Sequence, residues 1–178
     1  MKKILLASIL STLLFVSSAN AKDGTSVGIA DVMKINKDAK VMISLNKQKD
    51  AKLAAIQAEV NIKRKEFEGK EAELKNKQSL MDKEAFIQEL QTFQASVLKY
   101  DKSTEQKVAS IEKGYIEALK KIQKDYLDRI IKKVGKDKGF DLIVNSQTTV
   151  AISDNLDITD DIIEALNDEI KEIELKIK

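Results

Sequence analysis

Hydrophobic residues recur every third or fourth position through the long middle of the chain. A strict seven-residue spacing joins Leu53, Val60, Phe67, Leu74 and Met81. After an interruption, a spacing of three and four resumes with Leu90, Phe93, Val97 and Tyr100. The chain contains no proline, which would end or kink a helix. This pattern predicts two long amphipathic helices that pack against each other as a coiled coil.

A polar interruption separates these two predicted helices. Asp82 can cap a helix that begins at Lys83, and Glu84 would then lie near its positive end. Ser79, three residues before Asp82, offers an alternative start. We therefore place the tip of a helical hairpin at residues 78–82, within an arm that spans residues 46–134. From Lys47 to Gln78 the arm would be about 48 Å long, at about 1.5 Å per residue.

The second core position of each heptad is apolar at Ile56 but becomes lysine further along the arm. The simpler interpretation, which the sequence favours, is that these lysines extend from an ordinary coiled coil and have no other role. The alternative is a loosely packed distal arm that offers its apolar residues to a partner. The candidate binding residues of this alternative are Phe67, Leu74, Phe86, Leu90, Phe93 and Val97, with Lys63, Lys70 and Lys77 as charged neighbours.

Two segments outside the arm alternate apolar residues with a period of two, which is typical of β-strands. Residues 139–153 alternate through Phe140, Leu142 and Val144, pass a polar turn at 145–147, and alternate again through Val150 and Ile152. This predicts a β-hairpin. Residues 26–32 predict one further strand. Because an isolated hairpin is marginally stable, we expect the hairpin to pair with the N-terminal strand.

These elements predict an α+β fold in which the arm is inserted between the first strand and the C-terminal β-hairpin. The body would comprise residues 22–45 and 135–178, with three strands per chain. Such a body is short of core and has exposed sheet edges, so we expect copies to assemble and pool their strands. The expected residues of that shared core are Val27, Ile29, Leu142, Val144, Val150 and Ile152.

The acidic C-terminal region predicts a final helix. Thr159 is the expected N-cap, and Ile163, Leu166, Ile170, Ile173 and Ile177 would form one apolar stripe. Asp154, Asp157, Asp160 and Asp161 were considered as a calcium site. Their spacing lacks the glycine and terminal glutamate of an EF-hand loop, so helix capping is the preferred interpretation.

The first 21 residues have the features of a cleaved secretory signal peptide. Two lysines precede an apolar run over residues 4–16, and a small-residue cleavage site follows at 19–21. The apolar run is shorter than the roughly 20 residues that a membrane anchor needs. The chain contains no cysteine that could carry a lipid. We therefore expect an exported protein comprising residues 22–178.

Charge and composition narrow the classes of function. Residues 46–138 carry 22 basic and 16 acidic side chains, whereas residues 139–178 carry 3 and 10. Histidine, cysteine and tryptophan are absent, which removes Ser-His and Cys-His nucleophile pairs and the usual zinc ligands. Arg64 and Arg129 are the only arginines, which argues against base-reading nucleic-acid binding. We expect neither an enzyme nor a cofactor.

Together these parts resemble the Skp/OmpH family of periplasmic chaperones. The resemblance rests on the opening "VGIADVMKINKDAK", the hairpin "EFEGKEAELKNKQSLMDKEAFIQELQ" and the ending "FDLIVNSQTTVAISDNLDITDDIIEALN". It implies a periplasmic homotrimer whose three helical tentacles surround a cavity. Such trimers hold unfolded outer-membrane β-barrel proteins there without ATP and prevent their aggregation.

The charge of the arm and the extent of the resemblance lead to further expectations. The basic arm would assist capture of acidic clients and transient contact with anionic membrane surfaces. The family pattern ends near Asn167, so we expect the acidic tail from Asp168 onward to be dispensable for holding clients. The principal alternative is a structural or adaptor coiled-coil protein of the cell envelope that binds one folded partner.

Overall fold

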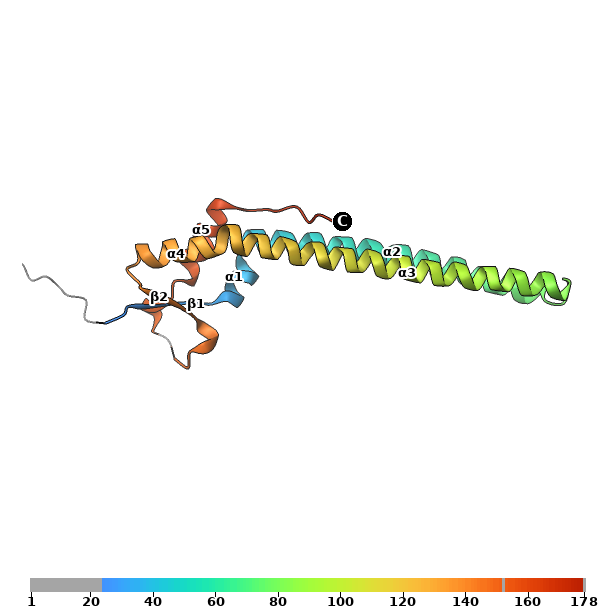
Figure 1. Cartoon of the computed structure of the whole chain (residues 1–178), viewed down its shortest axis with the longest axis horizontal. Helices are drawn as coiled ribbons and strands as arrows, with labels where there is room; N and C mark the ends of the chain where they lie inside the picture. The colour runs from blue at the N-terminus through green and yellow to red at the C-terminus, as the bar shows by residue number, and fades with distance from the viewer. Residues whose placement is uncertain (1–23, 152, 178) are drawn as a thin grey trace, which may run out of the picture.

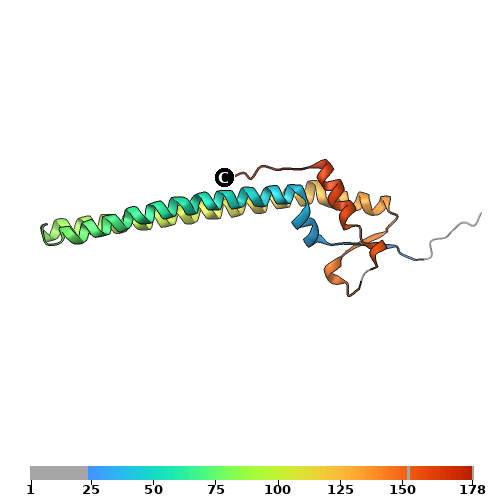
Figure 2. The same ribbon diagram turned by 180° about the vertical axis from the view of Figure 1, so that it is seen from behind.

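The computed structural model describes residues 24–151 and 153–177, and the expected signal peptide lies outside them. A long two-helix arm projects from a small body, as Figures 1 and 2 show from opposite sides. The body contains a two-stranded sheet and short helices. The α+β class and the inserted helical hairpin expected from the sequence are confirmed.

The sheet joins the two ends of the chain. Strand β1 (Val27–Ala30) pairs in parallel with β2 (Leu142–Asn145), with Val27 opposite Leu142 and Ala30 opposite Asn145. Parallel strands need a long crossover connection, and here the entire arm provides it. Gly28 is required at the junction because a Cβ there would lie 2.8 Å from side-chain carbons of both Ile143 and Phe140.

The predicted second strand of the β-hairpin is not formed in the described chain. After β2, residues Ser146–Thr148 form a 3-10 turn, η2, in which the Asn145 side chain accepts a hydrogen bond from the Gln147 amide. The Thr148 and Thr149 hydroxyls donate to the carbonyls of Asn145 and Ser146. These local bonds divert the chain from a tight reversal. Val150 is therefore fully exposed and belongs to no strand.

The first strand is also shorter than expected. The sequence predicts that the strand includes residues 31 and 32, but the Asp31 side chain accepts a hydrogen bond from the Lys34 amide at 3.0 Å. This bond caps helix α1 (Val32–Asp38), so the helix begins where the strand was expected to continue.

The arm consists of two long antiparallel helices. Helix α2 (Lys40–Lys77) runs outward, and α3 (Lys83–Ile122) returns. A π-helical turn, η1 (Gln123–Leu127), then joins α3 to α4 (Asp128–Asp137). At the tip, Asp82 accepts hydrogen bonds from the Glu84 and Ala85 amides, which confirms the predicted cap of α3.

The hydrophobic core lies where the base of the arm meets the body. Its most deeply buried side chains are Ile35, Val41, Leu45, Ile122, Ile158, Ile162 and Leu166. They come from α1, the ends of α2 and α3 nearest the body, and α5 (Thr159–Glu169) with its preceding residue. Between residues 46 and 110, Leu74 is the one hydrophobic side chain in the deeply buried class. Most of the arm therefore stands outside the core.

Helix α5 differs from its predicted form at both ends. Thr159 is its first helical residue, not its N-cap, and its hydroxyl accepts a hydrogen bond from the Asp31 amide at 2.8 Å. The helix stops at Glu169, so Ile170, Ile173 and Ile177 do not continue a helical stripe. Residues 170–177 instead run along the arm without helical structure (Figure 1).

Three of the four aspartates of the possible calcium site make local or ion-pair contacts. Asp157 accepts from the Thr159 amide, Asp160 pairs with Lys34 at 2.5 Å, and Asp161 pairs with Lys138 at 2.6 Å. Within the described residues, no group of three or more acidic side chains is arranged to hold a metal ion.

Candidate binding surface on the helical arm

The aromatic residues of the distal arm pack on one another across the hairpin. The Phe67 ring lies edge-on to Phe93 and Tyr100, with ring centroids 5.9 and 5.8 Å apart. The Lys63 ammonium lies 5.1 Å from the centroid of the Phe67 ring. These contacts bring three of the predicted binding residues, Lys63, Phe67 and Phe93, together at one level of the arm.

The remaining predicted apolar residues lie along the same inter-helix contact line. Phe86, Leu90 and Val97 are half-buried, as are Phe67 and Phe93. Leu74 is only 4% exposed, which leaves it almost no surface for a partner while the hairpin is closed. The structure thus places the predicted binding residues mainly at the contact between the two helices. Their availability to a partner would require the helices to separate locally.

The predicted lysines differ in their contacts. Lys63 forms an ion pair with Glu66 at 2.7 Å. Lys77 contacts Glu73 at 2.7 Å on its own helix and Glu89 at 3.3 Å on the facing helix. These hydrogen bonds raise the pKa of Lys77, and the bond from Lys77 lowers the pKa of Glu73. Lys70 is exposed. The positive charge of the distal arm is therefore partly matched by nearby carboxylates.

Several exposed apolar residues of the arm were missed by the heptad analysis. Ile62 is 70% exposed, Leu98 is 69% exposed, and Leu80 at the tip is 84% exposed. Each of these apolar residues falls outside the core positions of the heptad pattern. Apolar residues at such positions are the sequence signal by which they could have been found. They are the most exposed of the large apolar side chains that a partner can reach without opening the hairpin, and Ile87 and Ile116 of α3 are also exposed.

The residues expected to form a shared core occupy different environments in the single chain. Ile29 is buried, Val27 and Val144 are half-buried, and Leu142 is half-exposed. Ile152 lies outside the described residues. Strand β1 has β2 on one side and a parallel bridge from Ile29 to Asp157 on the other. The described chain places no strand against the outer edge of β2.

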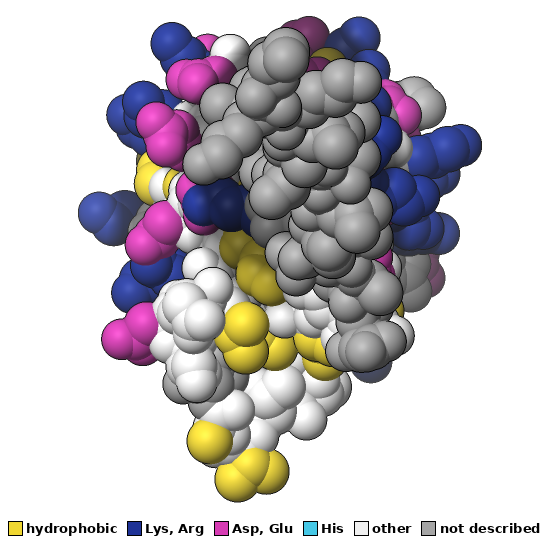
Figure 3. Space-filling model, turned by 90° about the vertical axis from the view of Figure 1, so that its left-hand side faces the viewer, with side chains coloured by type: hydrophobic (Ala, Val, Ile, Leu, Met, Phe, Trp, Pro, Cys, Tyr) yellow, Lys and Arg dark blue, Asp and Glu magenta, His cyan; other side chains and the backbone are white. Residues whose placement is uncertain are grey.

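Figure 3 shows the body end of the molecule. Hydrophobic side chains are visible in the lower half of this view, while charged side chains lie mainly along the flanks. Among the described residues, no helix is both long enough and apolar enough to cross a membrane.

A long helical hairpin inserted as the crossover of a small parallel sheet defines a protein built from a compact body and a projecting coiled-coil arm. The family model of the outer membrane proteins described as OmpH-like matches residues 26–166, which is most of the chain. The chain therefore belongs to the OmpH-like family.

A solved structure has the same fold. It is that of a candidate outer membrane chaperone (OmpH-like) from Caulobacter crescentus CB15, with a TM-score of 0.80 and 16% sequence identity. The alignment covers 98% of this chain and 97% of that chain. Among curated proteins, no match was found.

Proposed function

We propose that this protein is an ATP-independent periplasmic holdase that binds unfolded outer-membrane β-barrel proteins and prevents their aggregation. The observation that carries the proposal is the long arm, most of which lies outside the core and which exposes Ile62, Leu80 and Leu98. Family membership and the name of the solved relative support a chaperone role. The proposed activity is non-enzymatic and uses no cofactor.

The proposed functional unit is a homotrimer whose three arms surround a cavity. Three observations support assembly through the body: no strand of the described residues covers the outer edge of β2, Leu142 is half-exposed and Val150 is exposed. An exposed strand edge is a favourable site for pairing with another chain. In the trimer, Val27, Ile29, Leu142, Val144, Val150 and Ile152 would contribute to the shared core, and the chain after β2 could add the third strand.

Client capture would rest on many weak contacts made by three arms. Three linked arms bind with an avidity that a single arm lacks. The exposed apolar residues would make the first contacts, and local separation of the distal helices would add Phe67, Phe86, Leu90, Phe93 and Val97. Lys63, Lys70 and Lys77 would attract acidic clients and anionic membrane surfaces, an effect that salt screens.

The packed aromatic contacts favour one alternative function. The Phe67 ring contacts with Phe93 and Tyr100, and the burial of Leu74, are those of a closed coiled coil. A closed, rigid arm suits a structural or adaptor protein of the envelope that binds a single folded partner.

Aggregation of an urea-diluted outer-membrane barrel protein, measured by light scattering without nucleotide, tests the proposal. The wild-type protein should suppress scattering, and an adaptor should not. The triple variant Ile62→Ser, Leu80→Ser, Leu98→Ser should hold clients less well while keeping its helical circular dichroism. The comparison variant Phe67→Ser, Leu90→Ser, Phe93→Ser should differ from it by losing helical circular dichroism, because it removes contacts between the two helices. Full suppression by the exposed-residue variant would contradict the proposed contact surface.

A further inference from the structure

The C-terminal segment, residues 170–177, is held against the arm as an extended chain. The Gln48 side chain donates a hydrogen bond from Nε2 to the Ile173 carbonyl oxygen at 2.8 Å. Its Oε1 accepts a second bond from the Leu175 amide at 2.9 Å. One side chain therefore binds two backbone groups of the segment. Such bonds recognise an extended backbone and do not depend on its side chains.

Helix α3, which faces α2, leaves space for the backbone of the same segment. Gly114 lies on α3 under the segment, and a Cβ at this position would lie 2.2 Å from the Lys176 carbonyl oxygen. Any other residue would prevent the close approach of the segment. Glycine in a helix interior costs about 1 kcal/mol of helix stability relative to alanine. The space that the docked segment needs explains why glycine occupies position 114 despite this cost.

The side chains of the segment alternate in environment. Leu175 is only 3% exposed and packs with the core, and Ile173 is half-buried against it. Glu172, Glu174 and Lys176 are exposed. This period of two, apolar toward the protein and charged toward solvent, is also the pattern of a membrane strand of a β-barrel protein.

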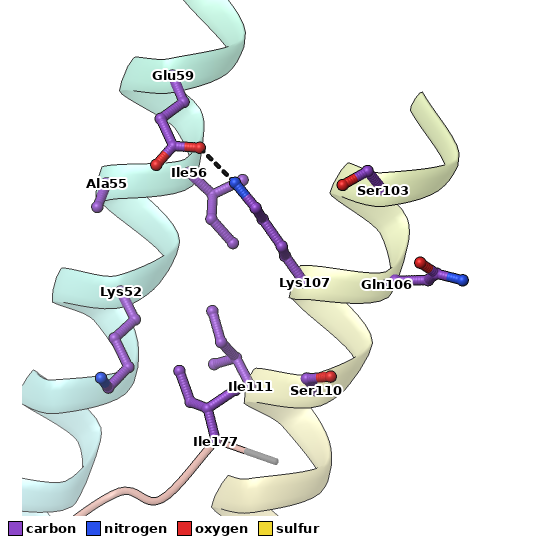
Figure 4. A pocket seen from close by; sticks show the side chains of 10 residues that line it. All are labelled: Lys52, Ala55, Ile56, Glu59, Ser103, Gln106, Lys107, Ser110, Ile111 and Ile177. Carbon is purple, nitrogen blue, oxygen red and sulfur yellow. Dashed lines mark hydrogen bonds and ion pairs between the residues drawn. The ribbon is translucent and has the colours of Figure 1, made fainter. Parts of the chain in front are cut away.

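The surface of α2 and α3 that contacts this segment, which includes Gln48 and Gly114, is called the groove here. It continues along the arm beyond the part that the segment occupies. Figure 4 shows Ile177 beside Ile111 of α3, with Ile56 of α2 further along the arm, and all three residues line a hollow of about 440 Å³. The ion pair between Glu59 and Lys107, at 2.7 Å, spans the two helices at its far end. The hollow offers space between the two helices for more apolar side chains than Ile177 alone.

We propose that this groove is a binding site for extended, alternately apolar segments of an unfolded chain, and that residues 170–177 occupy it as an internal competitor. The inference rests on the proposed function, since the displacing segment belongs to an unfolded barrel protein. A tethered competitor acts at a high effective concentration. A single weak segment would not displace it, whereas a client with many such segments would. The sequence predicts that the tail is dispensable for holding clients; on this proposal the tail also limits client binding, because it competes for the groove.

Hydrogen exchange of the unaltered full-length protein gives the first test. In the free protein, the Leu175 amide is bonded to Gln48 and should exchange slowly. On addition of an unfolded barrel protein, exchange in residues 170–177 should become several-fold faster. If the client binds and the exchange of this segment is unchanged, the groove is not the client site, although holdase activity stands. If no client binds at all, the proposed function fails.

Peptide binding tests the groove independently of any client. The full-length variant Leu175→Ser should release the tail and bind a fluorescent peptide with the sequence of residues 168–178, detected by anisotropy. Wild-type protein and the control Glu174→Ser, which changes an outward-facing residue, should bind it weakly. A peptide of the same composition with its apolar residues adjacent should not bind. Equal binding by Leu175→Ser and wild type would overturn the proposal.

Second-site variants locate the bound peptide. Added to Leu175→Ser, both Gln48→Ala and Gly114→Ala should weaken peptide binding on the order of tenfold, because they remove backbone hydrogen bonds or the space for the backbone. Two matched controls should leave binding unchanged. Gln57→Ala removes an exposed glutamine of α2, and Gly69→Ala alters a glycine with no atom within 4 Å of an added Cβ. Loss of binding in the controls as well would show that the peptide binds elsewhere.

Discussion

The body and the distal arm are stabilised by different interactions, although α2 and α3 run through both. Near the body, Leu45 and Ile122 are completely buried. Beyond Ile56 the helices are joined by Leu74, by edge-on aromatic contacts and by exposed ion pairs such as Lys107 with Glu59. Exposed ion pairs contribute at most about 1 kcal/mol each. The comparison indicates that the arm can deform while the body stays folded.

The strongest test of this difference compares two leucines on α2 that are both almost fully buried. Leu45→Ala should destabilise the whole protein by about 2–5 kcal/mol, because it leaves a cavity in the core. Leu74→Ala removes the same atoms from a thin two-helix contact that can relax. It should therefore lower global stability much less and should speed hydrogen exchange mainly in the distal arm. Urea unfolding and regional exchange measure both effects, and equal losses of global stability would refute the distinction.

A second comparison uses two glycines, one from each region. Gly28→Ala should destabilise the body by about 1–3 kcal/mol, because the added methyl collides with Ile143 and Phe140. Gly69→Ala, with open space around it, should stabilise the arm by up to about 1 kcal/mol through helix propensity. Thermal unfolding followed by circular dichroism should show shifts of opposite sign. A destabilising Gly69→Ala would mean that the arm has a tighter contact there.

The smallest expected effect concerns acid sensitivity of the arm. The hydrogen bond from Lys77 lowers the pKa of Glu73. The stabilising contribution is therefore present above the unfolded-state pKa of Glu73 and is lost as the pH falls through its lowered folded-state pKa. The distal arm should melt slightly earlier at about pH 3 than at pH 7, and Glu73→Gln should reduce this difference. Glu89→Gln, which removes the other carboxylate in contact with Lys77, is the matched comparison.

Local chemistry made much of the architecture predictable from the sequence. The heptad spacing specified the long helices, and the Asp82 side chain specified the start of α3, because both depend on neighbours within a few residues. Strand pairing between the N-terminal segment and residues 142–145 was also predictable, since few other segments alternate. The parallel direction of that pairing followed only from the crossover made by the arm.

The exposed and half-buried residues of the candidate surface were harder to predict. Periodicity distinguishes the face of a helix that packs from the face that does not. It does not show how deeply a two-helix contact buries each side chain. Leu74 and Phe67 both lie on the seven-residue spacing, yet Leu74 is buried and Phe67 is half-buried. Ile62 and Leu98 were overlooked because exposed apolar residues follow no period.

The C-terminal segment shows most clearly what the sequence determined and what it left open. Ile170, Ile173 and Ile177 fit a helical period, while Ile173, Leu175 and Ile177 fit the period of an extended chain. The amino-acid sequence alone determined the apolar content of this segment but allowed both conformations. Tertiary structure decided between them, because Gln48 and Gly114, distant in sequence, provide backbone hydrogen bonds and space that only an extended segment can use.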